Sequence, residues 1–372
     1  EPPAPMSDHS VRFAPPQGSP FTVELKQEVA RYFEQRGLSD KGSWRSWVRA
    51  LAMLALVFGP WALVLAGVLT GWAALAACVV MGVGVAGVGF AVGHDAQHGA
   101  FSRWPWANRL VGLSFDLMGA NGYLWRFTHN RIHHTFTNIH GFDEDIVVSP
   151  ALRLSRGSKR RGWHRIQHLT CWPLYSLTTL NWLVLKDFDF LLRGRVGPYA
   201  PPTYPRLLWP AVVLGKLACL SWQLVIPWLV LQPSPWQLLA GFLVMHMTAG
   251  LILALVFQLA HVVEGMAFPQ PAAGDRLGDT WAEHQLRTTA DFSRDNWLLG
   301  WYCGGLNFQV EHHLFPHVAS EHYAALAPIV EACARRHGLA YHHAPSFGTA
   351  LASHVRLLRE LGAPEPAAAQ AA

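Results

Sequence analysis

Four long apolar segments constrain the fold of this chain more than any other feature of its sequence. A helix needs about 20 apolar residues to cross the hydrocarbon core of a bilayer. Segments of this length, with one charged residue among them, occupy positions 50–69, 72–93, 207–231 and 236–260. Their apolar character is continuous, which is typical of membrane helices and unlike the alternating strands of a membrane barrel. The sequence therefore predicts an all-α membrane protein.

The connections between these segments predict how the spans pair. Two residues separate the first segment from the second, and four separate the third from the fourth. Connections this short join neighbouring antiparallel helices. We therefore expect two helical hairpins, with residues 94–206 and both termini together on one side of the membrane.

The basic residues predict which side that is. Only 14% of the chain is charged, against about 25% in an ordinary soluble protein, and 28 of the 29 Lys and Arg residues lie on the side of both termini. By the positive-inside rule this side is cytoplasmic. The exception, Lys216, lies within the third span and needs a partner, a cavity or a route to the interface.

One further apolar stretch, residues 169–185, raises the question of a fifth span. It carries no charge over 17 residues, but it contains Thr, Ser, Asn and Pro. Because it is short and polar for a span, we expect an amphipathic helix lying on the membrane surface.

Eight histidines form the candidate site. The second and fourth spans each end at a histidine, and two further clusters, "HNRIHH" and "QVEHH", lie in the segments that follow. Their neutral ring nitrogens would hold a metal, and an all-nitrogen set suits Zn, Cu, Fe or Ni. Eight ligands exceed what one ion takes, so we expect two ions that act with dioxygen on a lipid-soluble substrate. The residues are His94, His98, His129, His133, His134, His261, His312 and His313.

The remaining histidines fit simpler roles. His164 and His168 are four residues apart on the expected surface helix, where a polar face toward headgroups explains them. His246 lies fifteen residues before His261, about 22 Å along a helix, and is too far away to share that site. Isolated histidines are interpreted as helix-capping or interfacial residues, namely His9, His140, His284, His337 and His354.

The three histidine clusters resemble those of a known family. "HDAQH", "HNRIHH" and "QVEHH" are similar, in this order, to the three histidine boxes of membrane fatty acid desaturases. The surrounding sequence segments, such as "HDAQHGAFS" and "QVEHHLFP", resemble those of the linoleoyl-CoA (delta-6, front-end) branch of this family. The likeness covers residues 93–317. It implies a non-haem di-iron site with dioxygen as co-substrate, and it implies that the eight histidines are the iron ligands.

The resemblance also implies an electron supply and marks one departure. Gln309 replaces the first histidine that many relatives have in the third box, and is a possible weak ligand. Front-end relatives often carry a fused cytochrome b5 with an HPGG motif, which is absent from these 372 residues. We therefore expect a separate electron donor, a ferredoxin or a cytochrome b5-like carrier, docking on the basic surface.

Polar and aromatic residues near the boxes are candidates for supporting roles. We expect Asp95, Asn130, Glu311 and His317 to orient the imidazoles, whereas Asp143 and Asp145 fit either this role or solvated loop positions. An apolar tunnel for the substrate should begin near the ions, lined by Tyr123, Trp125 and Phe127, which fit an interfacial aromatic belt equally well. Basic side chains that could hold a CoA phosphate or a lipid headgroup, or only set the topology, are Arg126, Arg131 and residues 159–161.

These observations predict an acyl-CoA or acyl-lipid desaturase in a bacterial inner membrane, with its active site in the cytoplasm and no nucleic-acid partner. A lipid hydroxylase, ketolase or acetylenase would use the same ligands. A histidine-rich metal-binding or transport protein is less consistent, because transporters place their sites at mid-membrane in broken helices. We divide the chain into a partly disordered N-terminal segment, 1–49, a desaturase domain, 50–317, and a helical C-terminal segment with a disordered tail, 318–372.

Overall fold

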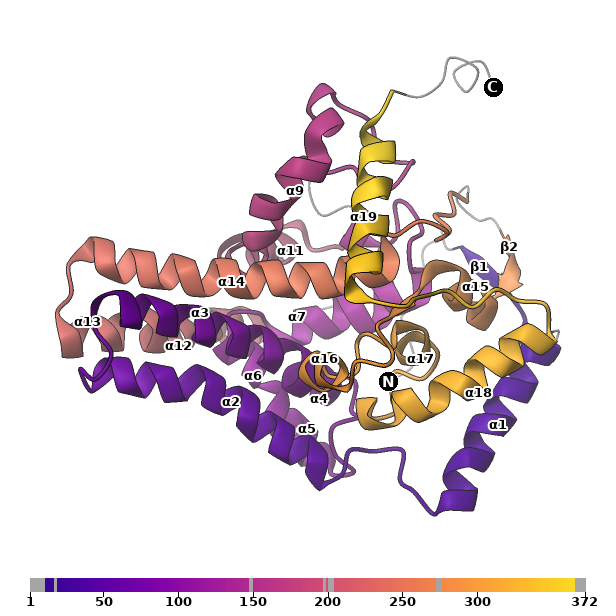
Figure 1. Ribbon diagram of the computed structural model, residues 1–372, viewed down its shortest axis with the longest axis horizontal. Helices are drawn as coiled ribbons and strands as arrows, with labels where there is room; N and C mark the ends of the chain where they lie inside the picture. The colour runs from indigo at the N-terminus through magenta and orange to yellow at the C-terminus, as the bar shows by residue number, and fades with distance from the viewer. Residues whose placement is uncertain are drawn as a thin grey trace.

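The fold is helical, with four candidate membrane spans. The computed structural model describes residues 11–16, 19–146, 150–196, 199, 204–271 and 276–364. Within these residues four helices are long and apolar enough to cross a bilayer, as the sequence predicts. Spans α2, α3 and α14 run side by side in Figure 1, and α3 contacts both of the others. The spans are α2 (Trp44–Leu65), α3 (Gly71–Val88) continued by η2 (Gly89–His94) and α4 (Asp95–Gln97), α12 (Leu208–Leu220) continued by η7 (Ser221–Val225) and α13 (Ile226–Leu231), and α14 (Pro235–His261).

The first two spans differ from the prediction at their ends. Helix α2 begins six residues earlier than expected, because the Ser43 side chain caps its backbone at Arg45, and it ends before Gly67, whose φ is +71°. The second span continues four residues beyond position 93. Hydropathy marks the lipid-facing part of a helix, whereas caps and turns determine where the helix stops.

Small residues allow α3 to pack closely between α2 and α14. A Cβ atom on Gly84 would lie 2.8 Å from the backbone of Leu56 in α2, and one on Gly82 would lie 2.5 Å from the Met245 carbonyl oxygen in α14. In a membrane, where helices gain little from the hydrophobic effect, such close contact supplies much of the packing energy.

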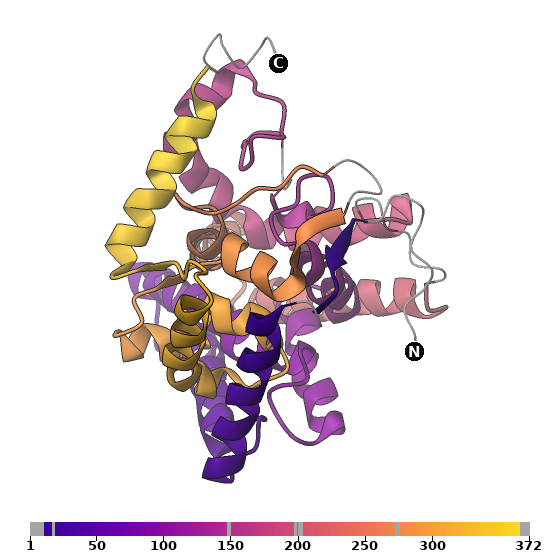
Figure 2. The same cartoon turned by 90° about the vertical axis from the view of Figure 1, so that its right-hand side faces the viewer.

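The elements outside the spans form a layer over their histidine-bearing ends. Helix α1 packs on α18, β1 pairs with β2 in parallel, and β3 pairs with β4 in parallel. Figure 2 looks onto this layer and shows the indigo β1 beside the orange β2 and α15. Its elements are β1 (Arg12–Ala14), α1 (Pro20–Arg36), β2 (Arg276–Thr280), α15 (Trp281–Thr288), β3 (Asp291–Phe292), α16 (Trp297–Tyr302), α17 (Gln309–Leu314), η8 (Ser320–His322), α18 (Tyr323–Arg336), β4 (His343–Ala344) and α19 (Phe347–Gly362).

Part of the N-terminal segment packs against the rest of the chain. Val11 is buried and Phe13 stacks on Phe136 at 6.2 Å between ring centroids, so these residues belong to a small core. His9 lies outside the described residues, as do the rest of residues 1–10 and the C-terminal residues 365–372.

The segment between the hairpins is built from short helices. It contains the middle histidine cluster, His129, His133 and His134, and the loop that follows this cluster. Its elements are α5 (Pro105–Gly112), α6 (Ser114–Leu117), α7 (Gly122–Arg126), η3 (Phe127–His133), α8 (His134–Phe136), η4 (Glu144–Ile146), η5 (Gly162–Ile166), α9 (Gln167–Ser176), α10 (Thr178–Asn181), η6 (Trp182–Lys186) and α11 (Asp187–Arg193).

The stretch at 169–185 reaches deeper than a surface helix would. It folds as α9, α10 and η6, and both α9 and α10 pack along α14. The Thr179 hydroxyl donates to the His246 carbonyl oxygen at 2.9 Å. His246 lies about 22 Å along the helix from His261, so α10 lies beside the middle of the span. Hydropathy did not predict this position because the depth comes from packing against α14.

Lys216, which lies within the third span, has a charged partner in α11. Its ammonium group forms an ion pair with Asp187 and donates to the carbonyl oxygens of Gly119 (2.7 Å) and Trp182 (2.8 Å). Of the possibilities left open by the sequence, the structure therefore shows a buried ion pair, in which the added hydrogen bonds offset the cost of removing the charges from water.

Candidate metal centre

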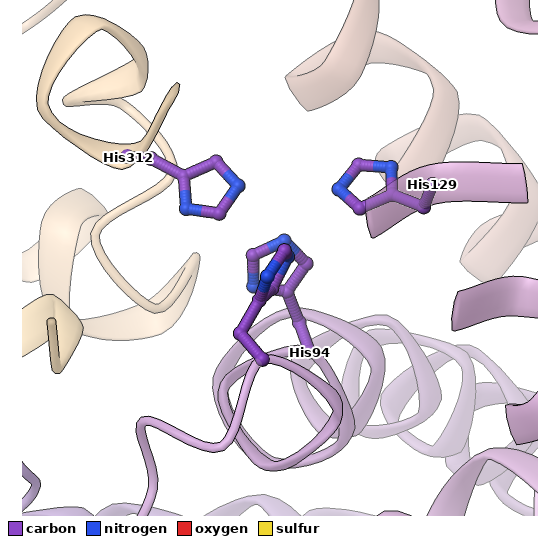
Figure 3. A group of neighbouring side chains, drawn as sticks. His94, His129 and His312 are labelled. Carbon is purple, nitrogen blue, oxygen red and sulfur yellow. The ribbon is translucent and has the colours of Figure 1, made fainter. Parts of the chain in front are cut away.

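The eight histidines meet at the ends of the spans. The second and fourth spans deliver His94 and His261, η3 and α8 deliver the middle cluster, and α17 delivers the last pair. The ring centroids of His94 and His312 lie 4.5 Å apart, and those of His134 and His313 lie 4.2 Å apart. Figure 3 shows His94, His129 and His312 pointing into a common space from three different elements. Residues up to 219 positions apart in sequence thus form one cluster.

The ring nitrogens form two separate groups. One potential ligand atom from each of His94, His98, His129 and His312 lies within 4.8 Å of the others, and the same holds for His133, His261 and His313. His134 forms a third group with His312 and His313, and therefore lies between the two. This arrangement is compatible with a metal site.

The unpaired ring nitrogens provide a test of whether a metal fits. Among the described residues, six of the eight histidines carry a buried nitrogen without a hydrogen-bond partner, namely His94, His98, His133, His134, His312 and His313. Leaving a buried polar atom unpaired costs about 1–3 kcal/mol. Six such atoms in one cluster fit a set of metal ligands.

The opposite ring nitrogens are held by the protein. His133 Nδ1 lies 3.0 Å from Asp143 Oδ2, His313 Nδ1 lies 2.8 Å from Gln285 Oε1, and His312 Nδ1 lies 3.2 Å from the Tyr323 hydroxyl. Such contacts fix the tautomer and orientation of an imidazole, so that its other nitrogen faces the metal.

Gln285 and Tyr323 were not predicted as site residues from the sequence. Gln285 lies 28 residues before His313, and Tyr323 lies 11 residues after His312. Neither belongs to a histidine box, and each reaches its histidine only because α15 and α18 pack on α17. The sequence contains no local signal for these contacts.

Burial keeps most of the cluster neutral. It lowers the pKa well below the usual value for five histidines, and the neighbouring imidazoles lower the pKa further: His98, His129, His134, His312 and His313. For His133 burial also disfavours the charged form, but Asp143 and Asp145 outweigh burial and raise the pKa. Neutral imidazoles have the free lone pairs that metal binding requires.

The predicted supporting residues take different positions. Asp95 accepts hydrogen bonds from Arg49 (3.1 Å) and Ser320 (2.6 Å), and its Oδ1 lies 3.7 Å from His94 Nδ1. Asn130 donates to the Gln97 carbonyl oxygen at 3.0 Å, beside His98 in the chain. Asp95 thus lies beside the His94 imidazole, whereas Asn130 contacts a backbone carbonyl group.

Glu311 and His317 contact groups other than the imidazoles. Glu311 is fully buried and accepts a hydrogen bond from the Tyr341 hydroxyl at 2.9 Å. Burial and then Asp291 raise the pKa of Glu311 well above its usual value. His317 is exposed, and its carbonyl oxygen accepts a hydrogen bond from Lys41 at 2.7 Å.

Gln309 and Asp145 border the cluster. Gln309 Nε2 lies 3.0 Å from His261 Nε2, on the side of the second histidine group. Asp145 Oδ2 lies 3.9 Å from Nδ1 of both His129 and His133, and its other oxygen lies 3.5 Å from the Lys186 ammonium group. Asp145 is therefore part of the site and not a solvated loop residue.

A cavity of about 1150 Å³ extends from the cluster. His94, His129 and Gln309 are among its lining residues together with Trp125, and residues of α14 and of α9 to α11 line much of the remainder. Of the three aromatic residues expected in a tunnel, Trp125 alone is among the lining residues. Tyr123 packs with Leu124 and Leu208, and Phe127 packs with Ile132 and Phe190.

Four histidines outside the cluster are buried, namely His164, His246, His284 and His354. His164 does not face headgroups: it is buried, with Nδ1 accepting from the Arg161 backbone at 3.0 Å. His284 lies 2.9 Å from the Thr137 carbonyl oxygen, and His354 lies 2.9 Å from the Tyr175 hydroxyl. His246 contacts Thr179 and Gln223 away from the cluster. Buried imidazoles need hydrogen-bond partners, and these histidines have them.

Comparison with known proteins identifies the family. Residues 70–345 match the family model described as Fatty acid desaturase. This chain belongs to the fatty acid desaturase family. The desaturase is 34% identical to the sn-1 linoleoyl-lipid 6-desaturase of Arthrospira platensis over 92% of each chain. It is also 34% identical to the protein of the same name from Synechocystis sp., over 96% of this chain and 99% of the relative.

A plant relative gives the same assignment. The desaturase is 33% identical to the acyl-lipid (8-3)-desaturase of Physcomitrium patens, over 96% of this chain and 74% of the relative. The resemblance predicted from the three histidine boxes is therefore confirmed, and the alternative of a metal-transport protein is wrong. The buried histidine groups are compatible with a metal site in a membrane oxidoreductase.

Proposed function

We propose that this desaturase introduces a double bond into an acyl chain of a membrane lipid, using dioxygen at two non-haem iron ions. The observation that carries the proposal is the cluster of buried, unpaired imidazole nitrogens at the end of a long cavity. The names of the relatives, which specify acyl-lipid substrates, favour a lipid-linked chain over an acyl-CoA.

The eight histidines would divide between the two ions. One ion would be held by His94, His98, His129 and His312, the other by His133, His261 and His313, with His134 between them. Gln309 would complete the second set beside His261. Iron bound there would activate dioxygen, whose oxidising power is needed to remove hydrogen from an unactivated methylene and which protein side chains lack.

The protein itself would position the substrate and orient the histidine rings. The cavity holds the acyl chain so that one methylene lies against the histidine cluster, and this positioning determines where the double bond forms. Phe115 and Trp125 line the cavity at the histidine end and exclude water there. Asp143, Gln285 and Tyr323 hold the rings in one orientation.

The membrane face at which the histidines lie would be the cytoplasmic face of a bacterial membrane. The distribution of Lys and Arg supports this orientation. Electrons would come from a ferredoxin or a cytochrome b5-like carrier, because each cycle reduces dioxygen to water and takes only two of the four electrons from the acyl chain.

Expression in a host of known lipid composition, together with an electron donor, tests the proposal. We expect new acyl chains that have lost two hydrogen atoms, whereas a hydroxylase would add an oxygen atom. The purified protein should contain two iron ions per chain. An unchanged lipid profile with active donor present, or a protein that holds zinc and no iron, would contradict the proposal.

A further inference from the structure

The N-terminal end of α9 and the short helix before it expose a row of apolar side chains. Trp163, Ile166 and Leu169 are 51%, 51% and 62% exposed. They follow one another at intervals of three residues, and η5 (Gly162–Ile166) is a 3-10 helix that leads directly into α9. Side chains three residues apart lie on one face of such a helix. The three residues therefore form a single apolar stripe on the surface.

The residues between those of the stripe are fixed to the protein. His164 and Gln167 are buried, and the Gln167 amide donates to the Leu358 carbonyl oxygen of α19 at 2.7 Å. Gly362, at the end of α19, packs so closely on the His164 carbonyl group that an added Cβ would overlap it. Because this face of η5 and α9 is held against α19, the apolar stripe points away from the protein.

Three basic side chains flank the stripe. Lys159, Arg161 and Arg165 are exposed, and none of them forms an ion pair with any residue that the structure describes. The nearby Arg156, by contrast, pairs with Glu360 of α19. The stretch from residue 159 to residue 169 therefore presents three uncompensated positive charges beside an apolar stripe.

This stretch lies at the level where the fourth span ends. His354 in α19 lies 2.6 Å, measured from its Nδ1, from the carbonyl oxygen of Val262, the residue that follows α14. Figure 1 shows the yellow α19 standing across α14, and α19 packs on both α9 and η5. A helix that crosses the end of a span lies along the membrane surface, so η5 is at the boundary between acyl chains and headgroups.

We propose that residues 159–169 bind anionic phospholipid at the membrane face where the histidines lie. The apolar stripe inserts between acyl chains, and the three cations hold headgroup phosphates through charge-assisted hydrogen bonds. Positive charge alone would suit an acidic protein equally well. The Arg161 guanidinium, however, lies over the Trp163 ring, 5.1 Å from its centroid, so that charge and apolar surface adjoin at the interface. This combination favours lipid.

Native mass spectrometry of the full chain tests the proposal by counting bound lipid. The protein, in neutral detergent, is mixed with equal amounts of dioleoyl phosphatidylglycerol and dioleoyl phosphatidylcholine, which differ in headgroup charge and share their acyl chains. We expect phosphatidylglycerol to bind about tenfold more often than phosphatidylcholine. Variants then separate this surface from lipid bound elsewhere on the protein.

A triple variant removes the charges of the surface and keeps its apolar stripe. Replacing Lys159, Arg161 and Arg165 with Gln should lower the preference for phosphatidylglycerol to about threefold or less. The matched control removes three exposed charges from α1 and should keep the native preference: Lys26→Gln, Arg31→Gln and Arg36→Gln.

A second variant removes the stripe and keeps the charges. Ile166→Ser combined with Leu169→Ser should reduce the binding of both lipids, because the acyl chains lose their contact whatever the headgroup. Thermal unfolding in the same detergent checks that each variant is folded.

Three results would overturn the proposal. The first is a native protein without preference for phosphatidylglycerol, and the second is a triple Gln variant that keeps the native preference or a control that loses it. The third is a triple Gln variant that sorts lipids like the native protein but no longer takes electrons from a ferredoxin, which would assign the surface to an acidic protein. None of these measurements depends on double-bond formation, so the proposed function can fail separately.

Discussion

Single histidines in this protein use their two ring nitrogens for different tasks. In His133, His312 and His313 the Nδ1 atom contacts a protein group and the buried Nε2 atom has no partner among the described residues. This division distinguishes a ligand from a structural histidine such as His354, whose two nitrogens contact Tyr175 and Val262. Metal content should therefore respond to some histidine substitutions and not to others.

His133→Ala should reduce the iron content of the purified protein to about half or less, because His133 belongs to one of the two ligand groups. Elemental analysis by mass spectrometry measures this directly. His140→Ala is the matched control, since His140 contacts Ser155 outside the cluster. Equal loss of iron in both variants would show that the histidines are wrongly divided.

Gln285 should matter for metal affinity although it is no ligand itself. Gln285→Leu removes the oxygen that contacts His313 Nδ1 and should weaken metal binding about 10- to 100-fold. Gln285→Glu keeps an acceptor at this position and should restore most of the affinity. Competition with a chelator measures both variants, and unchanged affinity in Gln285→Leu would argue against a positioning role.

At the scale of elements, the contact between α2 and α3 depends on glycine. Gly84→Ala should lower the free energy of unfolding by about 1–3 kcal/mol, because its Cβ would lie 2.8 Å from the backbone of Leu56. Gly59→Ala is the control on α2, where no atom lies within 4 Å of an added Cβ. Thermal unfolding in detergent compares the two, and equal effects would contradict this account of the packing.

His354 in α19 contacts Tyr175 in α9 and Val262 at the end of α14. The titration of His354 should make the stability of the protein depend on pH. Burial lowers the pKa of His354 from 6.5 to about 4. As the pH falls below 6.5 the unfolded chain binds a proton at this residue and the folded chain does not, so stability falls until about pH 4. The loss from this residue is about 3 kcal/mol in total.

His354→Gln removes the titrating group while it keeps a polar side chain, so this variant should lose less stability than the native protein between pH 6.5 and 4. Unfolding curves at several pH values measure the difference. A native protein whose stability does not change across this interval would contradict the prediction.

The elements also show what sequence patterns can and cannot predict. The spans were predictable because continuous apolar composition is itself the physical requirement for crossing lipid. The histidine clusters were predictable because their spacing within each segment matches the histidine boxes of a known family. The depth of 169–185, the pairing of Lys216 and the contact of Gln285 with His313 were not, because each depends on a partner from a distant segment.

For the whole molecule, the site is assembled between two layers. The spans supply His94 and His261, and the layer outside them supplies His312 and His313 together with the groups that orient them. The cavity leads from this junction to the flank of α14. The proposed chemistry would therefore take place where the two layers meet.

The ion pair between Lys216 and Asp187 has a consequence for how the protein is made. Asp187 leaves the ribosome before Lys216, so its carboxylate is already present when the third span is inserted. A lone ammonium group in lipid is unfavourable, and release of that span into the bilayer is therefore favoured only once it can dock on α11. Insertion thereby acquires an order, in which α11 is present first and the third span then packs against it.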